Sequence, residues 1–248
     1  MTRTLRIGSR FNGPVASGNG GYSAGLAARL VNSPAAEATL RAPIPLDVTL
    51  RAHAMGDGLD ITTDDAATRI LVMSLKPVSL EAPAIRSPGL EAATRAASTY
   101  RGADEHVLPT CFVCGPARMP GDGLRIFTDW VQDQNPNPFP IVAALWIPTP
   151  DLIGASDRIA PEFLWAALDC PGAFAIDKEP ILLGRMSAQI IERPRAGRPL
   201  IAVAWSKGSE RRKHFAGTAL FTDSGDLLAF SEQTWIRIDQ HAHEKASG

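Results

Sequence analysis

Hydrophobic and polar residues follow a helical period and then a strand period along the first part of the chain. Tyr22, Leu26 and Leu30 recur at every fourth position, which places them on one face of a helix. A glycine-rich stretch precedes them, and Asn19 or Ser17 can serve as the N-cap of this helix. Strand-like runs bounded by turn residues follow at residues 39–46, 48–54, 59–63 and 68–75.

The same order of elements returns after residue 110. A helix is expected over residues 161–170, and Pro171, which lacks an amide hydrogen, is expected to end or kink it just beyond Asp169. Strands are expected at residues 124–128, 141–147, 181–192, 200–205, 214–221 and 227–238. A helix followed by a meander of strands in both blocks predicts two α+β units, each with an antiparallel sheet that wraps a central helix.

The stretch between the blocks differs in composition from both. Prolines punctuate it at positions 77, 83, 88 and 109, and residues 90–99 predict a short alanine-rich helix within it. We therefore expect an N-terminal module at residues 1–109, with a linker from about residue 76, and a C-terminal module at 110–248. Pairing the two sheets edge to edge would remove two exposed strand edges, so one continuous sheet is expected.

Composition excludes several classes of protein. Hydrophobic residues make up 45% and charged residues 21% of the chain, and the net charge of −1 offers no field that attracts nucleic acid or an anionic membrane. Apolar runs are far shorter than the roughly 20 residues of a membrane helix, and the first residues lead into no apolar signal segment. Three cysteines make no disulfide framework. A cytoplasmic protein without a nucleic-acid or membrane partner is expected.

Several segments resemble hotdog-fold proteins. Asn19-Gly20-Gly21-Tyr22, which opens a helix, resembles the first helix of double-hotdog acyl-CoA thioesterases. Residues 111–115 followed by 123–126 resemble the opening of single-hotdog thioesterase-like proteins. Residues 163–169 resemble the central helix of phenylacetate-type thioesterases, which carries an aspartate midway. Residues 227–237 are similar to the last strand of the acyl-CoA thioesterase II family, including its glutamine.

This resemblance implies a double hotdog that hydrolyses an acyl-CoA or a related thioester, with coenzyme A as part of the substrate and no other cofactor. It assigns the activation or orientation of water to Asp169, and a hydrogen bond to that water to Gln233. It also places a hydroxyl residue where this sequence has Gly184. Either Ser187 takes that role after a shift in register, or the site lacks the hydroxyl.

The glycine-rich helix start is expected to form the other half of the site. A helix N-terminus offers free amide donors, so Gly20 and Gly21, beside Asn19, are expected to polarise the thioester carbonyl as an oxyanion hole. Because the second helix starts with Pro161 but carries Asp169, one composite site between the two modules is expected. The residues expected to line or back an apolar acyl pocket are Tyr22, Leu26, Leu30, Trp165 and Trp235.

Two further motifs allow more than one interpretation. The charged run at residues 210–214 is typical of a solvated loop, although Arg211 and Arg212 could bind the phosphates of coenzyme A. Cys111 and Cys114 form a single C-x-x-C motif, whereas a structural zinc site needs four ligands and His106 is the nearest other candidate. We therefore expect no metal, a structural knuckle at this motif, and Cys170 as a small buried apolar residue.

Two other functions remain compatible with this fold. A protein that binds an acyl thioester without hydrolysing it would explain the missing hydroxyl at Gly184. An enoyl-CoA hydratase or dehydratase of this fold usually pairs an aspartate with a histidine, and neither expected helix contains a histidine. The hydrolase is the leading interpretation, and a homo-oligomer that takes a small acyl thioester is expected.

Overall fold

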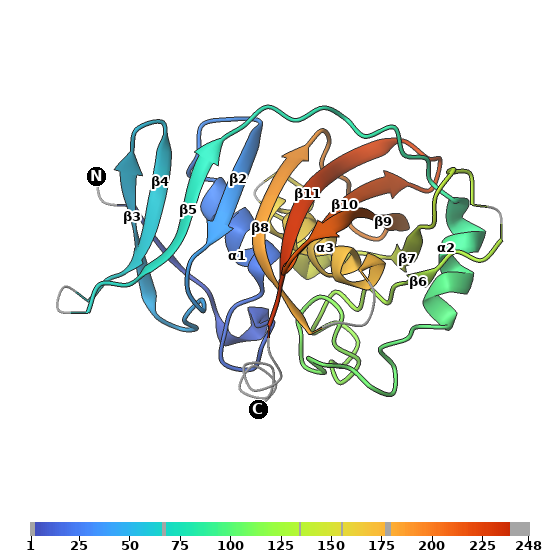
Figure 1. The fold of residues 1–248 in the computed structure, drawn as a ribbon, viewed down its shortest axis with the longest axis horizontal. Helices are drawn as coiled ribbons and strands as arrows, with labels where there is room; N and C mark the ends of the chain where they lie inside the picture. Colours follow the sequence, from blue (N-terminus) through green and yellow to red (C-terminus); the bar gives the residue numbers. More distant parts are fainter. Residues whose placement is uncertain (1–2, 66–67, 134, 155, 177–179, 239–248) are drawn as a thin grey trace.

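The computed structural model describes residues 3–65, 68–133, 135–154, 156–176 and 180–238. They form one antiparallel sheet of 11 strands with two helices, α1 (Gly20–Ala28) and α3 (Pro161–Ala175), against one face, and a third helix, α2 (Gly89–Ser98), at one end (Figure 1). The strands are β1 (Arg3–Arg6), β2 (Ala35–Leu40), β3 (Thr49–Met55), β4 (Gly58–Thr63), β5 (Leu71–Pro77), β6 (Asp129–Trp130), β7 (Val142–Trp146), β8 (Ile181–Ile190), β9 (Leu200–Glu210), β10 (Lys213–Thr222) and β11 (Leu227–Arg237).

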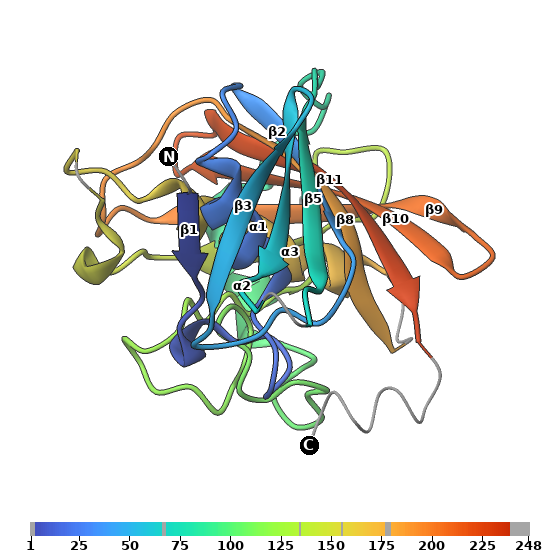
Figure 2. The ribbon, with the colours of Figure 1, turned by 90° about the vertical axis from the view of Figure 1, so that its left-hand side faces the viewer.

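The predicted edge-to-edge junction lies between β2 and β8. The strand order is β1-β3-β4-β5-β2-β8-β11-β10-β9-β7-β6, so the strands before residue 78 form one half of the sheet and those after residue 128 the other. Ala38 on β2 pairs with Met186 on β8, and both side chains are buried beneath the sheet. Figure 2 shows the sheet twisting around the helices. The prediction of a double hotdog with one continuous sheet is confirmed.

Two glycines let the central helices approach each other closely. A Cβ at Gly21 would lie 2.5 Å from Asp169 Cβ, and a Cβ at Gly25 would lie 2.5 Å from Trp165 Cβ. These positions are one helical turn apart, so they share one face of α1. Because neither residue has a side chain, the backbone of α1 lies directly against α3.

The outer face of the C-terminal half of the sheet is covered by the segment that joins the two halves. Ile85 from this segment and Ala93 from α2 pack against Val203, Phe221 and Phe230. Figure 1 shows the segment running along one rim of the sheet to α2. Burial on both faces explains why residues 200–204 of β9 are continuously apolar instead of alternating.

Several expected elements have different bounds. The expected strand at residues 39–46 is instead Ala35–Leu40, and Arg3–Arg6 forms a strand that was not expected. Residues 124–128 are no strand, because the amides of Leu124 and Ile126 donate to the carbonyls of Phe112 and Val113 in a neighbouring loop. No helix of the described residues is long and apolar enough to cross a membrane.

The sequence predicted that α3 ends or kinks just beyond Asp169, and the predicted end is wrong. The helix continues through Pro171 to Ala175. A proline leaves a helix short of one amide donor. Here the carbonyl that loses its amide donor is that of Ala167, whereas Gln233 on β11 contacts the next two, with its Nε2 2.6 Å from the Leu168 carbonyl oxygen and 3.3 Å from that of Asp169.

Candidate functional site

Asp169 lies in the middle of α3, where the two halves of the molecule meet. Its side chain is 2% exposed, and its Oδ2 accepts hydrogen bonds from the Gly21 amide and from Asn19 Nδ2, both at 2.9 Å. Asn19 is also the N-cap of α1, because its Oδ1 accepts from the Tyr22 amide at 2.8 Å. The structure thus brings together three residues that the sequence analysis assigned to one composite site.

The surroundings of Asp169 favour its protonated form more than water does. Burial raises the pKa of its carboxyl to about 7, although the Gly21 amide and Asn19 lower it in part. The second carboxylate oxygen, Oδ1, has no hydrogen-bond partner among the described residues. One oxygen is therefore fixed by two donors, and the other, which is also buried, keeps unused capacity to accept a hydrogen bond.

A cavity of about 740 Å³ opens next to Asp169. Small-molecule sites are commonly roughly 300–1,000 Å³, so this volume suits an acyl group with part of its carrier. The walls come from the start of α1, from residues 101–114, from α3 and from the ends of β8 and β11. Its apolar lining includes Leu108, Phe174, Ile181, Leu183 and Trp235. Asp169, Asn19, Gly20 and Trp235 are predicted site residues that line it.

Gln233 contacts the backbone of α3. Besides its donation to the carbonyls of Leu168 and Asp169, its Oε1 accepts from Trp235 Nε1 at 2.8 Å. It is 3% exposed, and a Cβ at Gly172 would lie 1.8 Å from its Oε1. These contacts make Gln233 a brace for the turn that carries Asp169, and its expected hydrogen bond to a catalytic water stays a prediction.

Ser187 lies on the side of the sheet that faces away from the helices. Its neighbours on β8, Met186 and Ala188, belong to the core beneath the sheet, and Ser187 Oγ donates to Glu37 Oε2 at 3.3 Å. At Gly184, where the resemblance places a hydroxyl, a Cβ would lie 2.7 Å from Ile236 Cγ1. This geometry does not bring a hydroxyl from either position to Asp169.

Two of the expected pocket residues pack in the core. The Tyr22 ring stacks on Phe11 with a centroid distance of 4.1 Å, and the Trp165 side chain packs against Gly25. Neither lines the cavity described above, and Leu26 and Leu30 do not line it either, whereas Trp235 does. Tyr22 and Trp165 therefore back the site by fixing α1 against α3.

Arg211 and Arg212 form the turn between β9 and β10. Both are exposed, and Arg212 Nε donates to the Arg237 carbonyl oxygen at 3.2 Å. Arg237 ends β11 two residues beyond Trp235, so the turn lies at the same end of the sheet as the cavity wall. A contact of these guanidinium groups with coenzyme A phosphates stays a prediction.

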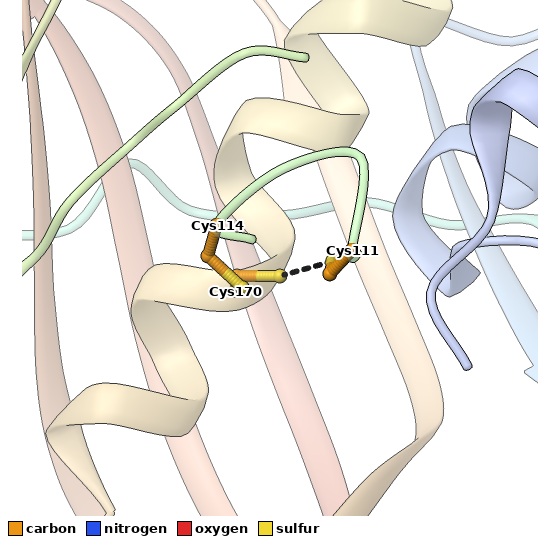
Figure 3. Close-up of side chains that lie close together, drawn as sticks. All are labelled: Cys111, Cys114 and Cys170. Carbon is orange, nitrogen blue, oxygen red and sulfur yellow. Dashed lines mark hydrogen bonds between the residues drawn. The ribbon is translucent and has the colours of Figure 1, made fainter. Parts of the chain in front are cut away.

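Two features of the cavity wall were not expected. Cys170, which follows Asp169, meets Cys111 and Cys114, and its sulfur lies 3.7 Å from the Cys111 sulfur (Figure 3). The neighbouring thiols of Cys114 and Cys170 hold the pKa of the Cys111 thiol below its usual range. His106 also lines the cavity, and burial lowers its pKa. The adjacency of Cys170 to Asp169 was a signal for the first feature, whereas His106 lies in a loop without any periodic pattern.

Comparisons with known proteins identify the fold. No family model matches the sequence, and no curated protein matches it either. Among solved structures, a hotdog-fold protein from Alicyclobacillus acidocaldarius is 12% identical with a TM-score of 0.58, over 96% of this chain and 93% of that one.

Two further structures cover 96% of this chain and 92% of their own. They are a thioesterase II candidate from Thermobifida fusca, 16% identical with a TM-score of 0.57, and a variant of the GphF dehydratase, 16% identical with a TM-score of 0.56. Identities this low show the fold and leave the reaction open. The chain is therefore a double-hotdog protein, as its resemblance to thioesterases of that fold implied.

Proposed function

We propose that this protein hydrolyses an acyl thioester, with acyl-CoA as the substrate class. The observation that carries the proposal is the carboxylate of Asp169, whose Oδ2 is held by Gly21 and Asn19 while Oδ1 has no partner in the described chain. A carboxylate fixed in this way at a cavity wall can orient a water and accept its proton.

The reaction needs a nucleophile and a donor for the developing oxyanion. In the proposed path, water loses a proton to Asp169 Oδ1 and attacks the thioester carbonyl, and the C–S bond then breaks. The proton passes to the departing thiolate, so that thioester and water give a carboxylic acid and free coenzyme A. The Gly21 amide is engaged by Asp169, which leaves the Gly20 amide at the start of α1 as the candidate oxyanion donor.

The lining of the cavity supports an apolar acyl group. Phe174, Ile181, Leu183 and Trp235 provide large apolar surfaces beside Asp169. An acyl chain placed against them would bring its carbonyl to the start of α1. Arg212 lies at the end of the sheet beyond Trp235, where it can meet the phosphates of the carrier.

The direct test is a panel of acyl-CoA substrates with short, long and aromatic acyl groups, with free coenzyme A measured by chromatography. At least one substrate is expected to turn over catalytically, and Asp169→Asn is expected to abolish most of that turnover. A native protein that binds acyl-CoA but releases no coenzyme A across the panel would contradict the hydrolase and favour the binding protein.

A second candidate is the hydration of an enoyl-CoA or the reverse dehydration. His106 shares the cavity with Asp169, and its Nδ1 accepts from the Leu108 amide at 2.9 Å. A neutral ring held in this way carries its proton on Nε2, which has no partner among the described residues. Formation of a 3-hydroxyacyl-CoA from an enoyl-CoA, lost in His106→Gln, would favour this reaction over hydrolysis.

A further inference from the structure

All three cysteines of the chain meet in one cluster. Their sulfur atoms lie within 4.8 Å of one another, although Cys111 and Cys114 belong to a loop and Cys170 to α3 (Figure 3). An ion at the centre of a triangle with sides of at most 4.8 Å would lie at most about 2.8 Å from each sulfur. Zn–S bonds are roughly 2.3 Å long, so shifts of a few tenths of an ångström would bring all three sulfurs into bonding distance of one ion.

The loop that carries two of these sulfurs has the form of a chelating turn. The side-chain amide of Asn19 donates to the Cys111 sulfur at 3.9 Å, and the Gly115 amide donates to the Cys111 carbonyl at 2.9 Å. Tyr100 fixes the second cysteine, since its hydroxyl donates to the Cys114 carbonyl at 2.7 Å. Amide donors aimed at a sulfur stabilise the thiolate that a metal binds.

The cluster is buried and yet borders the cavity. Cys111, Cys114 and Cys170 are 1%, 4% and 8% exposed, and all three line the cavity beside Asp169. Buried thiolates need a compensating charge, which a bound cation supplies. A ligand from the cavity can complete a tetrahedron whose other three corners are sulfurs.

We propose that Cys111, Cys114 and Cys170 form a mononuclear site for a thiophilic divalent cation of the Zn²⁺ class, with the fourth position facing the cavity. Each thiol that binds releases its proton to solvent. His106 is not a ligand in this arrangement, because the Leu108 amide occupies its Nδ1 and places the ring proton on Nε2. The bound cation ties the loop at residues 111–115 to the helix that carries Asp169.

The test uses the full chain, reduced and freed of metal by a chelator. Titration with Zn²⁺ against a chromophoric chelator is expected to give one equivalent per chain. The melting temperature is expected to rise by about 5–10 °C at a free Zn²⁺ concentration about 100 times its Kd. Co²⁺ in its place is expected to show thiolate-to-cobalt charge-transfer absorption.

Thiol protection supplies a second measurement on the unaltered protein. Because the chain has three cysteines, the intact mass after iodoacetamide treatment counts every free thiol. Zn²⁺ is expected to protect all three. Equal alkylation with and without Zn²⁺, or a Cys111–Cys170 disulfide in place of a bound ion, would overturn the proposal.

Single substitutions test the ligand set. Loss of a residue that only orients a metal ligand weakens metal binding roughly 10- to 100-fold. We expect a larger loss of Zn²⁺ affinity in each of the variants Cys111→Ser, Cys114→Ser and Cys170→Ser. His106→Gln is the matched control and is expected to keep wild-type affinity. Unchanged binding in all three serine variants, or loss of binding in His106→Gln, would overturn the three-sulfur site. If a serine variant does not fold, the thiol-protection result on the wild type decides.

Discussion

Gly21 and Asp169 meet where the two central helices touch: the Gly21 amide donates to Asp169 Oδ2 over 2.9 Å, and a Cβ on Gly21 would lie 2.5 Å from Asp169 Cβ. Gly21 therefore donates its amide to the carboxylate and, because it has no side chain, leaves the space that the carboxylate occupies. Each half of the molecule contributes one of the two residues, so neither half alone holds the site.

Gly21→Ala is expected to displace Asp169 and lower kcat/KM by about 10- to 100-fold, because a misplacement of about 1 Å costs on that order. The melting temperature should also fall, since α1 can no longer lie as close to α3. Gly8→Ala is the control, because a Cβ there meets only ordinary contacts at 3.7 Å or more. Wild-type activity in a folded Gly21→Ala protein would contradict the close contact.

Asn19 has two tasks that a substitution can separate. Asn19→Ser keeps a side-chain oxygen for the N-cap but removes the Nδ2 amide that donates to Asp169. We expect near-wild-type stability with turnover lowered about tenfold, whereas Asn19→Ala should also lose about 1 kcal/mol of unfolding free energy. Thermal melts and acyl-CoA kinetics on both variants check this. Equal kinetics in Asn19→Ser and wild type would remove Asn19 from the site.

The fold could be predicted from the sequence because its periodicities are strong. The spacing of Tyr22 and Leu26 marked α1, although Leu30 lies beyond the end of this helix at Ala28, and the strand-like runs marked most of the sheet. The predicted bounds of the elements were wrong where tertiary contacts decide them. Arg3–Arg6, for example, is a strand only because β3 lies beside it. Likewise, Pro171 predicted that α3 ends just beyond Asp169, whereas the helix continues to Ala175.

The candidate site could be predicted only in part. The pairing of Asn19 and Gly21 with Asp169 followed from two motifs in the expected order. The place of Ser187 depends on which face of β8 it occupies, and a bulge between Leu183 and Arg185 shifts the alternation there. His106 has no regular element to place it, and the third sulfur of the cysteine cluster comes from a helix 56 residues beyond Cys114.

Gln233→Ala is expected to destabilise the protein by about 1–3 kcal/mol, because buried carbonyls at Leu168 and Asp169 lose a donor. Turnover should fall less than in Asp169→Asn. The half-buried Gln189 on the neighbouring strand is the matched control, and Gln189→Ala should change the unfolding free energy little. Denaturant unfolding of the two variants gives the comparison, and equal small effects would contradict the bracing contact.

Ser187→Ala is expected to leave kcat and KM within about twofold of wild type, because Ser187 faces Glu37 on the side of β8 away from the helices. Steady-state kinetics with the best acyl-CoA substrate measures this. A loss of about 100-fold, the scale of a positioned acid–base group, would show that the hydroxyl acts in the reaction after all.

The most direct test of the account is the turnover of Asp169→Asn with an acyl-CoA that the wild type demonstrably hydrolyses. The asparagine keeps the size of the side chain and removes its ability to accept a proton. We expect kcat to fall about 100-fold or more with KM little changed, since the lost interaction acts mainly in the transition state. Wild-type kcat in a folded Asp169→Asn protein would contradict the role of Asp169 and, with it, the proposed site.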